Sequence, residues 1–293
     1  MTFCYQKCTD RAGRQFMEIT GYEGQRKHLS VPEFIEDLPV RRIGNHAFSG
    51  RDDLESVQLP ETLDTLAAYA FYNCRNLKSL RLYDGVEDYY DGVIKQCGAL
   101  WEITLIQKRG SFSVMKELLA DNDRMLRFIL EPSGLHLTFP AYVYNFVEDV
   151  EARVLHHKIE GSGYPYRECV TRKGVDLLSY DRLFPHAQVD DFDAAVWIAM
   201  DRLMYPLELE QEAHKTYMDF LKQKMPSVLE KLIPEGRVEE IRYLASHSLM
   251  SREEKEHALS LAAKEKQTEI SAVVMECGRE QFRKEDSMEL EDW

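Results

Sequence analysis

Apolar residues recur with a fixed period in the first half of the chain. Segments 54–59, 77–82 and 100–105 follow the pattern LxxLxL, with Val57 and Ile103 as substitutions, and are evenly spaced without an insertion. The last apolar positions of each segment alternate with polar ones, which predicts a short strand with one buried face. One such strand cannot bury its face alone, so we expect copies stacked ~4.8 Å apart around one core.

Residues around these motifs repeat in the same register. An apolar pair precedes each motif and predicts the opposite wall of each coil: Ala47-Phe48, Ala70-Phe71 and Val93-Ile94. A fourth copy at 125–130 is slightly displaced from this register, and its apolar pair Leu118-Leu119 lies in a short helical stretch. A partial first copy, HLSVPEF, has Leu29 and Val31 as its inward pair. Together these copies predict a solenoid.

The segment LPETLDTLAAYAFYNCRNLKSLRL resembles the BspA-like leucine-rich repeats of bacteria. VPEFIEDLPVRRIGNHAF looks like the opening repeat of that family, and RQFMEITGYEG looks like its N-terminal strand. The resemblance covers about residues 15–140. It implies a curved solenoid without enzymatic activity, often a surface or adhesion module.

Both ends of a solenoid need a cover, because an open end exposes apolar core and a strand edge. The segment FCYQK…RQFMEITGY is predicted to form the N-terminal cap as a hairpin. After Leu130, the turn signal Pro132-Ser133-Gly134 precedes LHLTFP, which alternates like a further strand. Residues 141–189 are interpreted as an ordered connector and C-terminal cap.

The pattern becomes helical at Asp190 and predicts a domain over residues 190–293. Helices are expected to stop before Pro206 and Pro226, to restart at the capping box Ser251-x-x-Glu254, and to end at Gly278. The last four helices form two similar pairs, in which Ile241 corresponds to Ile270. These pairs resemble ankyrin repeats, with an ordinary antiparallel bundle as the alternative. The fold class is therefore α+β: a leucine-rich-repeat solenoid over residues 1–140, with short parallel strands in a curved sheet, then an all-α helical-repeat or bundle domain.

Composition and charge narrow the classes of partner. The 293 residues carry a net charge of −14, which disfavours binding to nucleic acid or to anionic membranes. No stretch approaches the ~20 apolar residues of a membrane helix, and the N-terminus lacks the apolar run of a signal peptide. We therefore predict a cytoplasmic protein with reduced thiols, no nucleic acid partner and no membrane insertion.

Motifs for catalysis, metals and cofactors are absent from the sequence. It contains no P-loop, G-x-S-x-G or H-E-x-x-H pattern, and Cys4 and Cys8 lack two further obvious zinc ligands. We therefore predict no catalytic residues, no metal and no cofactor. The alternative is a hydrolase with a site in connector residues 156–169, which contain His156-His157 and Cys169.

Cys74 occupies a repeated position rather than a catalytic motif. The equivalent residue is Arg51 in the preceding coil and Cys97 in the next. Because the position does not require sulfur, Cys74 is interpreted as a small turn-packing residue, close enough to Cys97 for a disulfide in an oxidising compartment.

The residues between the inward leucines are predicted to form three columns on the concave face of the sheet. The columns are His28, Ser56, Ser79, Glu102 and Arg127, then Ser30, Gln58, Arg81, Thr104 and Ile129, then Pro32, Pro60, Tyr83, Ile106 and Glu131. Tyr83, Ile106 and Ile129 predict an apolar patch rimmed by Arg81, Arg127 and Glu102, with Trp101 beside it. Packing of the following segment or of the helical domain over this patch is the alternative.

An exposed apolar cluster with charges at its rim is typical of a protein-binding site. We therefore predict a non-catalytic protein–protein interaction module that binds a protein partner through its concave face. The predicted binding residues are Gln58, Ser79, Arg81, Tyr83, Trp101, Glu102, Thr104, Ile106, Arg127 and Ile129. A cell-surface adhesion role is the alternative if the protein is exported.

Overall fold

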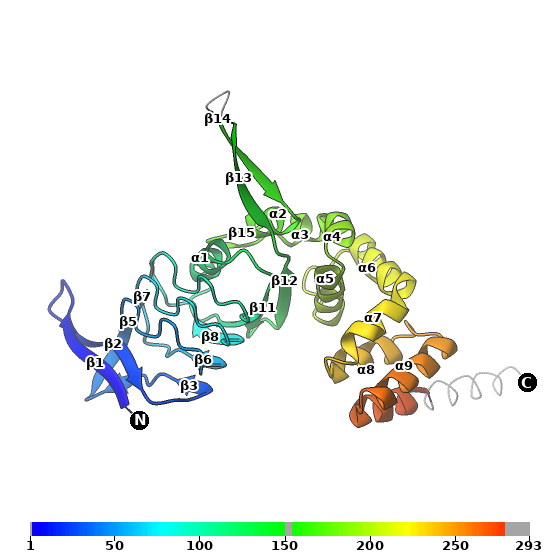
Figure 1. Cartoon of the computed structure of the whole chain (residues 1–293), viewed down its shortest axis with the longest axis horizontal. Helices are drawn as coiled ribbons and strands as arrows, with labels where there is room; N and C mark the ends of the chain where they lie inside the picture. Colours follow the sequence, from blue (N-terminus) through cyan, green and yellow to red (C-terminus); the bar gives the residue numbers. More distant parts are fainter. Residues whose placement is uncertain (1, 150–153, 279–293) are drawn as a thin grey trace, which may run out of the picture. The chain divides into compact units, whose positions relative to one another are not determined.

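The chain divides into two compact units, Met1–Ile198 and Ala199–Trp293 (Figure 1). The computed structural model describes residues 2–149 and 154–278, with side chains described outside 146–158. The division falls inside helix α5 (Phe192–Met204), so the first half of this helix belongs to the solenoid unit.

The LxxLxL motifs form the predicted parallel sheet. Its strands are β3 (His28–Ser30), β6 (Ser56–Gln58), β8 (Ser79–Tyr83), β10 (Glu102–Ile106) and β11 (Leu126–Glu131). They pair in parallel in the order of the sequence, and β12 (Leu135–Phe139) adds to β11 in the antiparallel direction. The solenoid and the strand predicted after Leu130 are thus confirmed.

A second sheet lines the other side of the coils. The hairpin β1 (Thr2–Thr9) and β2 (Gln15–Glu23) is antiparallel, as predicted for the N-terminal cap. β2 then pairs in parallel with β5 (Leu38–Ile43), followed by β7 (Thr65–Leu66) and β9 (Asp88–Tyr89), while β4 (Phe34–Ile35) pairs with β5. The hairpin therefore covers the edge that the first coil would expose.

The core lies between the two sheets. The inward leucines and the apolar pairs are buried, among them Leu80, Leu82 and Ala70. Phe48 stacks on Phe71 of the next coil with ring centroids 5.1 Å apart and ring planes 5° apart. The amide of Phe48 also donates to the Ala70 carbonyl at 2.8 Å. Each apolar pair therefore forms the wall predicted for its coil.

In each coil, the residues at two turn positions adopt the left-handed backbone conformation. The first is occupied by His46, Tyr69 and Gly92, with φ of 55°, 59° and 72°. The second, one turn further along, is occupied by Gly50, Asn73 and Gln96, with φ of 71°, 58° and 63°. A Cβ on Gly92 would overlap the Tyr69 ring, so glycine also leaves room for the preceding coil.

Cys74 and Cys97 are buried free thiols at equivalent positions. The Cys74 thiol donates to the Phe48 carbonyl at 3.0 Å, and the Cys97 thiol donates to the Phe71 carbonyl at 3.1 Å. The neighbouring Cys74 thiol and burial together raise the pKa of Cys97 well above its usual range. Cys74 therefore packs a turn of the solenoid, as interpreted from its spacing.

The chain after β10 closes the solenoid with irregular elements. They are α1 (Ser113–Asp121), the hairpin β13 (Val143–Asp149) and β14 (Val154–Glu160), α2 (Gly163–Glu168), the pair β15 (Val170–Thr171) and β16 (Gly174–Val175), α3 (Leu177–Arg182) and α4 (Phe184–Asp190). Arg167 is buried at their centre, and burial lowers the pKa of its guanidinium to about 10. It donates to the carbonyls of Leu119, Asn122, Arg124, Pro140 and Gly163.

The second unit is helical, as predicted. Its helices are α6 (Gln211–Gln223), α7 (Met225–Leu232), α8 (Val238–Ser246), α9 (Arg252–Lys264) and residues 268–278. The predicted capping box is present: Glu254 donates its amide to Ser251 Oγ at 3.2 Å, and Ser251 donates its amide to Glu254 Oε2 at 2.7 Å. Gly278 is still helical, so the expected end of this helix lies outside the described residues.

The last four helices of this unit are the ones predicted to form two similar pairs. Ile241 and Ile270 are both fully buried at equivalent positions. The ankyrin-like interpretation stays a prediction. None of the helices within residues 2–149 and 154–278 combines the length and the apolar composition of a membrane-spanning segment.

Candidate functional site

The three predicted columns lie in register across the parallel sheet. Ser79 pairs with Glu102, which pairs with Arg127. In the same way Arg81, Thr104 and Ile129 align, and so do Tyr83, Ile106 and Glu131. On β3, β6 and β8 the column residues are exposed or half-buried, whereas the leucines and valine between them are buried. The register that the spacing predicts is therefore confirmed.

The N-terminal part of this face is hollowed and open to solvent. A hollow of about 290 Å³ crosses strands β3 to β10. Its polar lining consists of His28, Ser30, Ser56, Gln58, Ser79, Arg81, Glu102 and Thr104. Within it, His28 Nδ1 lies 2.8 Å from Ser56 Oγ. This region, defined by those eight residues, is called the open end below.

Three charged side chains, from Lys27, Glu55 and Lys78, form ion pairs beside the open end. Lys27 Nζ and Lys78 Nζ lie 2.6 and 2.8 Å from the two carboxylate oxygens of Glu55. The two lysines, hydrogen-bonded to it, hold the pKa of Glu55 at about 2. The lysine side chains are 73% and 60% exposed. These charges are therefore largely solvated.

A bidentate ion pair bridges the middle of the sheet. Arg81 Nη1 and Nη2 donate to the two carboxylate oxygens of Glu131 at 3.0 and 2.8 Å. Because β10 lies between β8 and β11, the pair passes over that strand at Thr104 and Ile106. This corrects the expected apolar patch: Ile106 is only 9% exposed, and Tyr83 and Ile129 are half-buried.

The C-terminal part of the face is covered. Arg127 is 6% exposed and lies between two indoles, with its guanidinium carbon 5.7 Å from the Trp101 ring centre and 5.1 Å from that of Trp197 on α5. Arg127 also donates to Glu102 at 3.4 Å and to His136 Nδ1 at 3.0 Å. This region, defined by Trp101, Arg127, His136 and Trp197, is called the closed end below. Arg127 therefore does not rim an exposed patch, because Trp197 packs over it.

Trp197 was not predicted to contribute to this face. The helical pattern marks Val196 and Ala199 as apolar positions of the helix and leaves Trp197 between them. Trp197 is 2% exposed, and its ring centre lies 5.2 Å from that of Trp101. Its size and apolar character were a signal that this helix buries more than one face.

His136 is neutral at the closed end. Burial and the nearby Arg127 guanidinium lower the pKa of His136 to about 4. The Arg127 donor requires an unprotonated Nδ1, which fits the neutral ring with its proton on Nε2. The closed end is thus a packed polar cluster with its charges compensated internally.

The connector holds the residues of the hydrolase alternative. Burial raises the pKa of the Cys169 thiol to about 11, and this thiol donates to the Pro165 carbonyl at 3.6 Å. A nucleophilic cysteine needs a lowered pKa, so this environment favours a structural thiol. His156 and His157 both lie on β14, and their side chains are outside the described residues.

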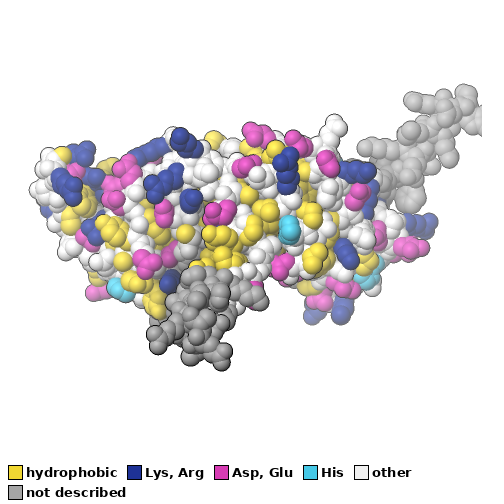
Figure 2. Space-filling view, turned by 90° about the horizontal axis from the view of Figure 1, so that it is seen from above, with side chains coloured by type: hydrophobic (Ala, Val, Ile, Leu, Met, Phe, Trp, Pro, Cys, Tyr) yellow, Lys and Arg dark blue, Asp and Glu magenta, His cyan; other side chains and the backbone are white. Residues whose placement is uncertain are grey.

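Apolar side chains gather near the base of the hairpin β13–β14 (Figure 2). Val143 is 52% exposed and Tyr144 43%, and Ile159 and Tyr164 are each 38% exposed. The connector therefore presents apolar surface that its composition did not single out.

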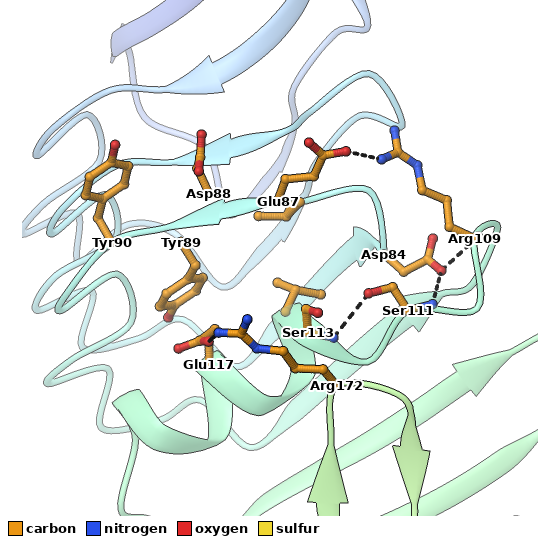
Figure 3. Close-up of a pocket in the computed structure, with 12 residues that line it drawn as sticks. Asp84, Glu87, Asp88, Tyr89, Tyr90, Arg109, Ser111, Ser113, Glu117 and Arg172 are labelled. Carbon is orange, nitrogen blue, oxygen red and sulfur yellow. Dashed lines mark hydrogen bonds and ion pairs between the residues drawn. The ribbon is translucent and has the colours of Figure 1, made fainter.

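A second hollow, of about 570 Å³, lies beside α1 and was not predicted (Figure 3). Its charges are largely paired: Arg109 contacts Glu87 at 2.6 Å and Arg172 contacts Glu117 at 3.5 Å. Asp84 is buried and accepts three backbone amides, from Lys108, Arg109 and Ser111. Asp84 therefore orders the loop that leads into α1.

No group of three or more His, Cys, Asp or Glu side chains within residues 2–145 and 159–278 is arranged to hold a metal ion. Cys8, considered above with Cys4, donates its thiol to Glu18 Oε2 at 3.4 Å.

Comparison with known proteins gives matches for the repeat region. Residues 28–121 match the family model described as BspA type Leucine rich repeat region, with six copies. This match ends before the connector and the helical unit begin. No curated protein is detectably similar in sequence to the chain.

Solved structures of three leucine-rich proteins are each similar to about a third of this chain. A leucine-rich repeat protein of T. pallidum is 25% identical over 34% of this chain and 50% of that protein, with a TM-score of 0.32. A leucine-rich cell surface protein of Faecalibacterium prausnitzii is 25% identical over 35% and 31%, with a TM-score of 0.30. A leucine-rich repeat protein of Bacteroides capillosus is 22% identical over 36% and 79%, with a TM-score of 0.31.

The chain spans half the length of the T. pallidum protein and less of the F. prausnitzii protein. Residues 28–121 of this chain are thus similar to BspA-type leucine-rich repeats.

Proposed function

We propose that this protein is a non-catalytic interaction module that binds a protein partner at the open end of its concave face. The observation that carries the proposal is the hollow across β3 to β10, where aligned polar side chains face solvent. Its volume of about 290 Å³ lies at the lower limit of small-molecule sites, which span ~300–1,000 Å³. A shallow cradle of this kind suits a segment of another protein better than an enclosed small ligand.

The proposal divides the residues predicted for binding into three groups. Gln58, Ser79, Arg81, Glu102 and Thr104 line the hollow and are proposed as direct contacts. Tyr83 and Ile129 are half-buried beside the Arg81–Glu131 pair and flank the site. Trp101, Ile106 and Arg127 are proposed to support the site through packing.

An affinity pull-down from lysate of the source cells tests this surface. Ser79→Arg places a long cation in the hollow, and Asn45→Arg adds the same side chain at an exposed turn outside it. We expect Ser79→Arg to lower recovery of the partner at least about tenfold and Asn45→Arg to leave it unchanged. Circular dichroism confirms that both variants are folded. Identical partner sets for wild type and Ser79→Arg would contradict the proposal.

We also propose a cytoplasmic location, supported by the two buried thiols that donate to carbonyls in adjacent coils. Intact-mass measurement after alkylation in denaturant, without a reductant, should find all six cysteines modified. A bond between Cys74 and Cys97 would contradict this proposal. Cell fractionation separates it from the surface-adhesion alternative.

A further inference from the structure

We propose that the open end recognises an extended, uncharged polypeptide segment rich in hydroxyl and amide side chains. The inference rests on the proposed function, because it names the chemistry of the partner at the same surface. The proposed ligand is a short segment that has no charged or apolar anchor residue.

The side chains that offer hydrogen-bonding capacity at the open end are mostly hydroxyl, amide and imidazole groups. They are His28, Ser30, Ser56, Gln58, Ser79 and Thr104. Hydroxyl and amide groups both donate and accept hydrogen bonds, so they match the carbonyls, amides and polar side chains of a peptide. His28, Ser30 and Gln58 are exposed, which leaves these groups accessible to a partner.

The formal charges that line the hollow are already compensated. Arg81 holds Glu131 through two hydrogen bonds, and Glu102 accepts from the buried Arg127. A charged ligand would have to separate one of these pairs or leave its own charge without a partner, and both cost free energy. An uncharged segment avoids this cost.

The lysines beside the hollow do not reverse this preference. Lys27 and Lys78 are 73% and 60% exposed and share the carboxylate of Glu55. Exposed charges of this kind are solvated and screened by salt, so they add little to affinity.

The spacing of the strands sets the length of the segment. The hollow crosses from β3 to β10, passing over β6 and β8. At ~4.8 Å per step between neighbouring strands the lining extends ~14 Å, which about four residues of extended chain span at ~3.4 Å each. The apolar residues of the lining, Leu29, Val57 and Leu80, are buried. The lining therefore exposes no large apolar side chain that could hold an aromatic anchor.

A random dodecapeptide library displayed on phage tests the chemistry directly. The full chain is the bait, and each selected clone is measured against Gln58→Glu and Gln15→Glu. Gln58→Glu keeps the shape of the side chain but adds a negative charge to the hollow, whereas Gln15→Glu makes the same change on the exposed β1–β2 hairpin. We expect clones enriched in Ser, Thr, Asn and Gln, with binding lowered about tenfold or more by Gln58→Glu and unchanged by Gln15→Glu.

Salt dependence gives a second readout with one synthetic peptide from the selection. Fluorescence anisotropy should show that Kd changes less than about threefold between 50 and 500 mM NaCl, because no ion pair forms on binding. Clones rich in Lys, Arg, Asp or Glu, or a Kd that rises more than tenfold with salt, would overturn the inference. A selection that yields no clone sensitive to Gln58→Glu would overturn it as well.

The two proposals fail separately. Clones that depend on the hollow but carry charged residues leave the proposed function intact and remove only the inference about chemistry. Lysate partners indifferent to Ser79→Arg remove the proposed function itself.

Discussion

The two ends of the concave sheet share one backbone pattern and differ in what covers it. At the open end, β3, β6 and β8 present serine, glutamine and histidine to solvent. At the closed end, the same column carries Arg127, which packs against Trp197 of α5. The repeat therefore determines register, whereas the segments that follow it in sequence determine exposure.

This contrast separates the residues that hold the molecule together from those available to a partner. Closed-end side chains contact several elements each, so their removal should cost folding free energy. Open-end side chains contact few groups, so their removal should cost affinity instead. Substitutions at the two ends test this division.

The largest effect is expected at Arg167, where the chain closes the solenoid. Arg167→Met removes a buried fork that binds five backbone carbonyls and stacks 4.7 Å from the Tyr142 ring. The carbonyls would stay buried without their donor, so we expect the free energy of unfolding of the first unit to fall by about 4–5 kcal/mol. Urea titration followed by hydrogen exchange of the β10 and β11 amides measures this.

Arg172→Met is the matched control for Arg167→Met. The Arg172 side chain is 73% exposed and lies 3.5 Å from Glu117. We expect a change below about 0.5 kcal/mol. Equal losses for the two variants would show that the Arg167 fork does not hold the closure together.

Trp197→Ala removes the cover of the closed end. It deletes a fully packed indole that contacts Trp101 and Arg127. We expect a loss of about 3 kcal/mol in the same measurement, together with faster exchange of the β10 and β11 amides. Gln58→Ala at the open end is the control and should change stability by less than about 0.5 kcal/mol. Comparable losses would mean that the two ends do not differ in stability.

The regular part of the fold could be predicted because its signal is local and repeated. Leu77, Leu80 and Leu82 recur at fixed spacing, and all three are buried where the period places them. The capping box at Ser251 was equally readable, since a few adjacent residues make the whole motif.

The candidate site was predicted only in its register. Whether Ile106 is exposed depends on a contact between Arg81 and Glu131, which lie 50 positions apart. Whether Arg127 is exposed depends on Trp197, which lies much later in the chain on another element. A short-range sequence pattern predicts neither contact. Both depend on how far the side chains reach and on where later segments of the chain pack.

A smaller effect should appear as a pH dependence at the closed end. The folded state holds the pKa of His136 at about 4, below the ordinary value of ~6.5, so folding favours the neutral ring. The stability that the neutral His136 ring gives to the folded state is fully present above about pH 6.5 and is lost as the pH falls towards 4. His136 is half-buried, so after allowance for solvent screening we expect a loss of the order of 1 kcal/mol.

His136→Gln removes the titrating ring and should flatten this part of the stability curve. Urea midpoints at pH 7.0, 5.5 and 4.5 for wild type and variant give the difference. If the urea midpoints of the two proteins change with pH in parallel, His136 does not cause the expected loss of stability at low pH.

The smallest effect is expected at the boundary between the two ends, where Arg81 meets Glu131. The side chains are 38% and 42% exposed, so the pair should stabilise the fold by less than about 1 kcal/mol despite its bidentate geometry. A double-mutant cycle with Arg81→Met, Glu131→Gln and both changes isolates that coupling from the packing of each side chain. A coupling above about 2 kcal/mol would place Arg81 with the structural residues of the closed end. A small coupling energy, together with faster hydrogen exchange of the Ile106 amide in Arg81→Met, would show that the Arg81–Glu131 pair covers β10 but stabilises the fold only weakly. Arg81 would then remain available to the open end, and the division between the two ends would run along β10.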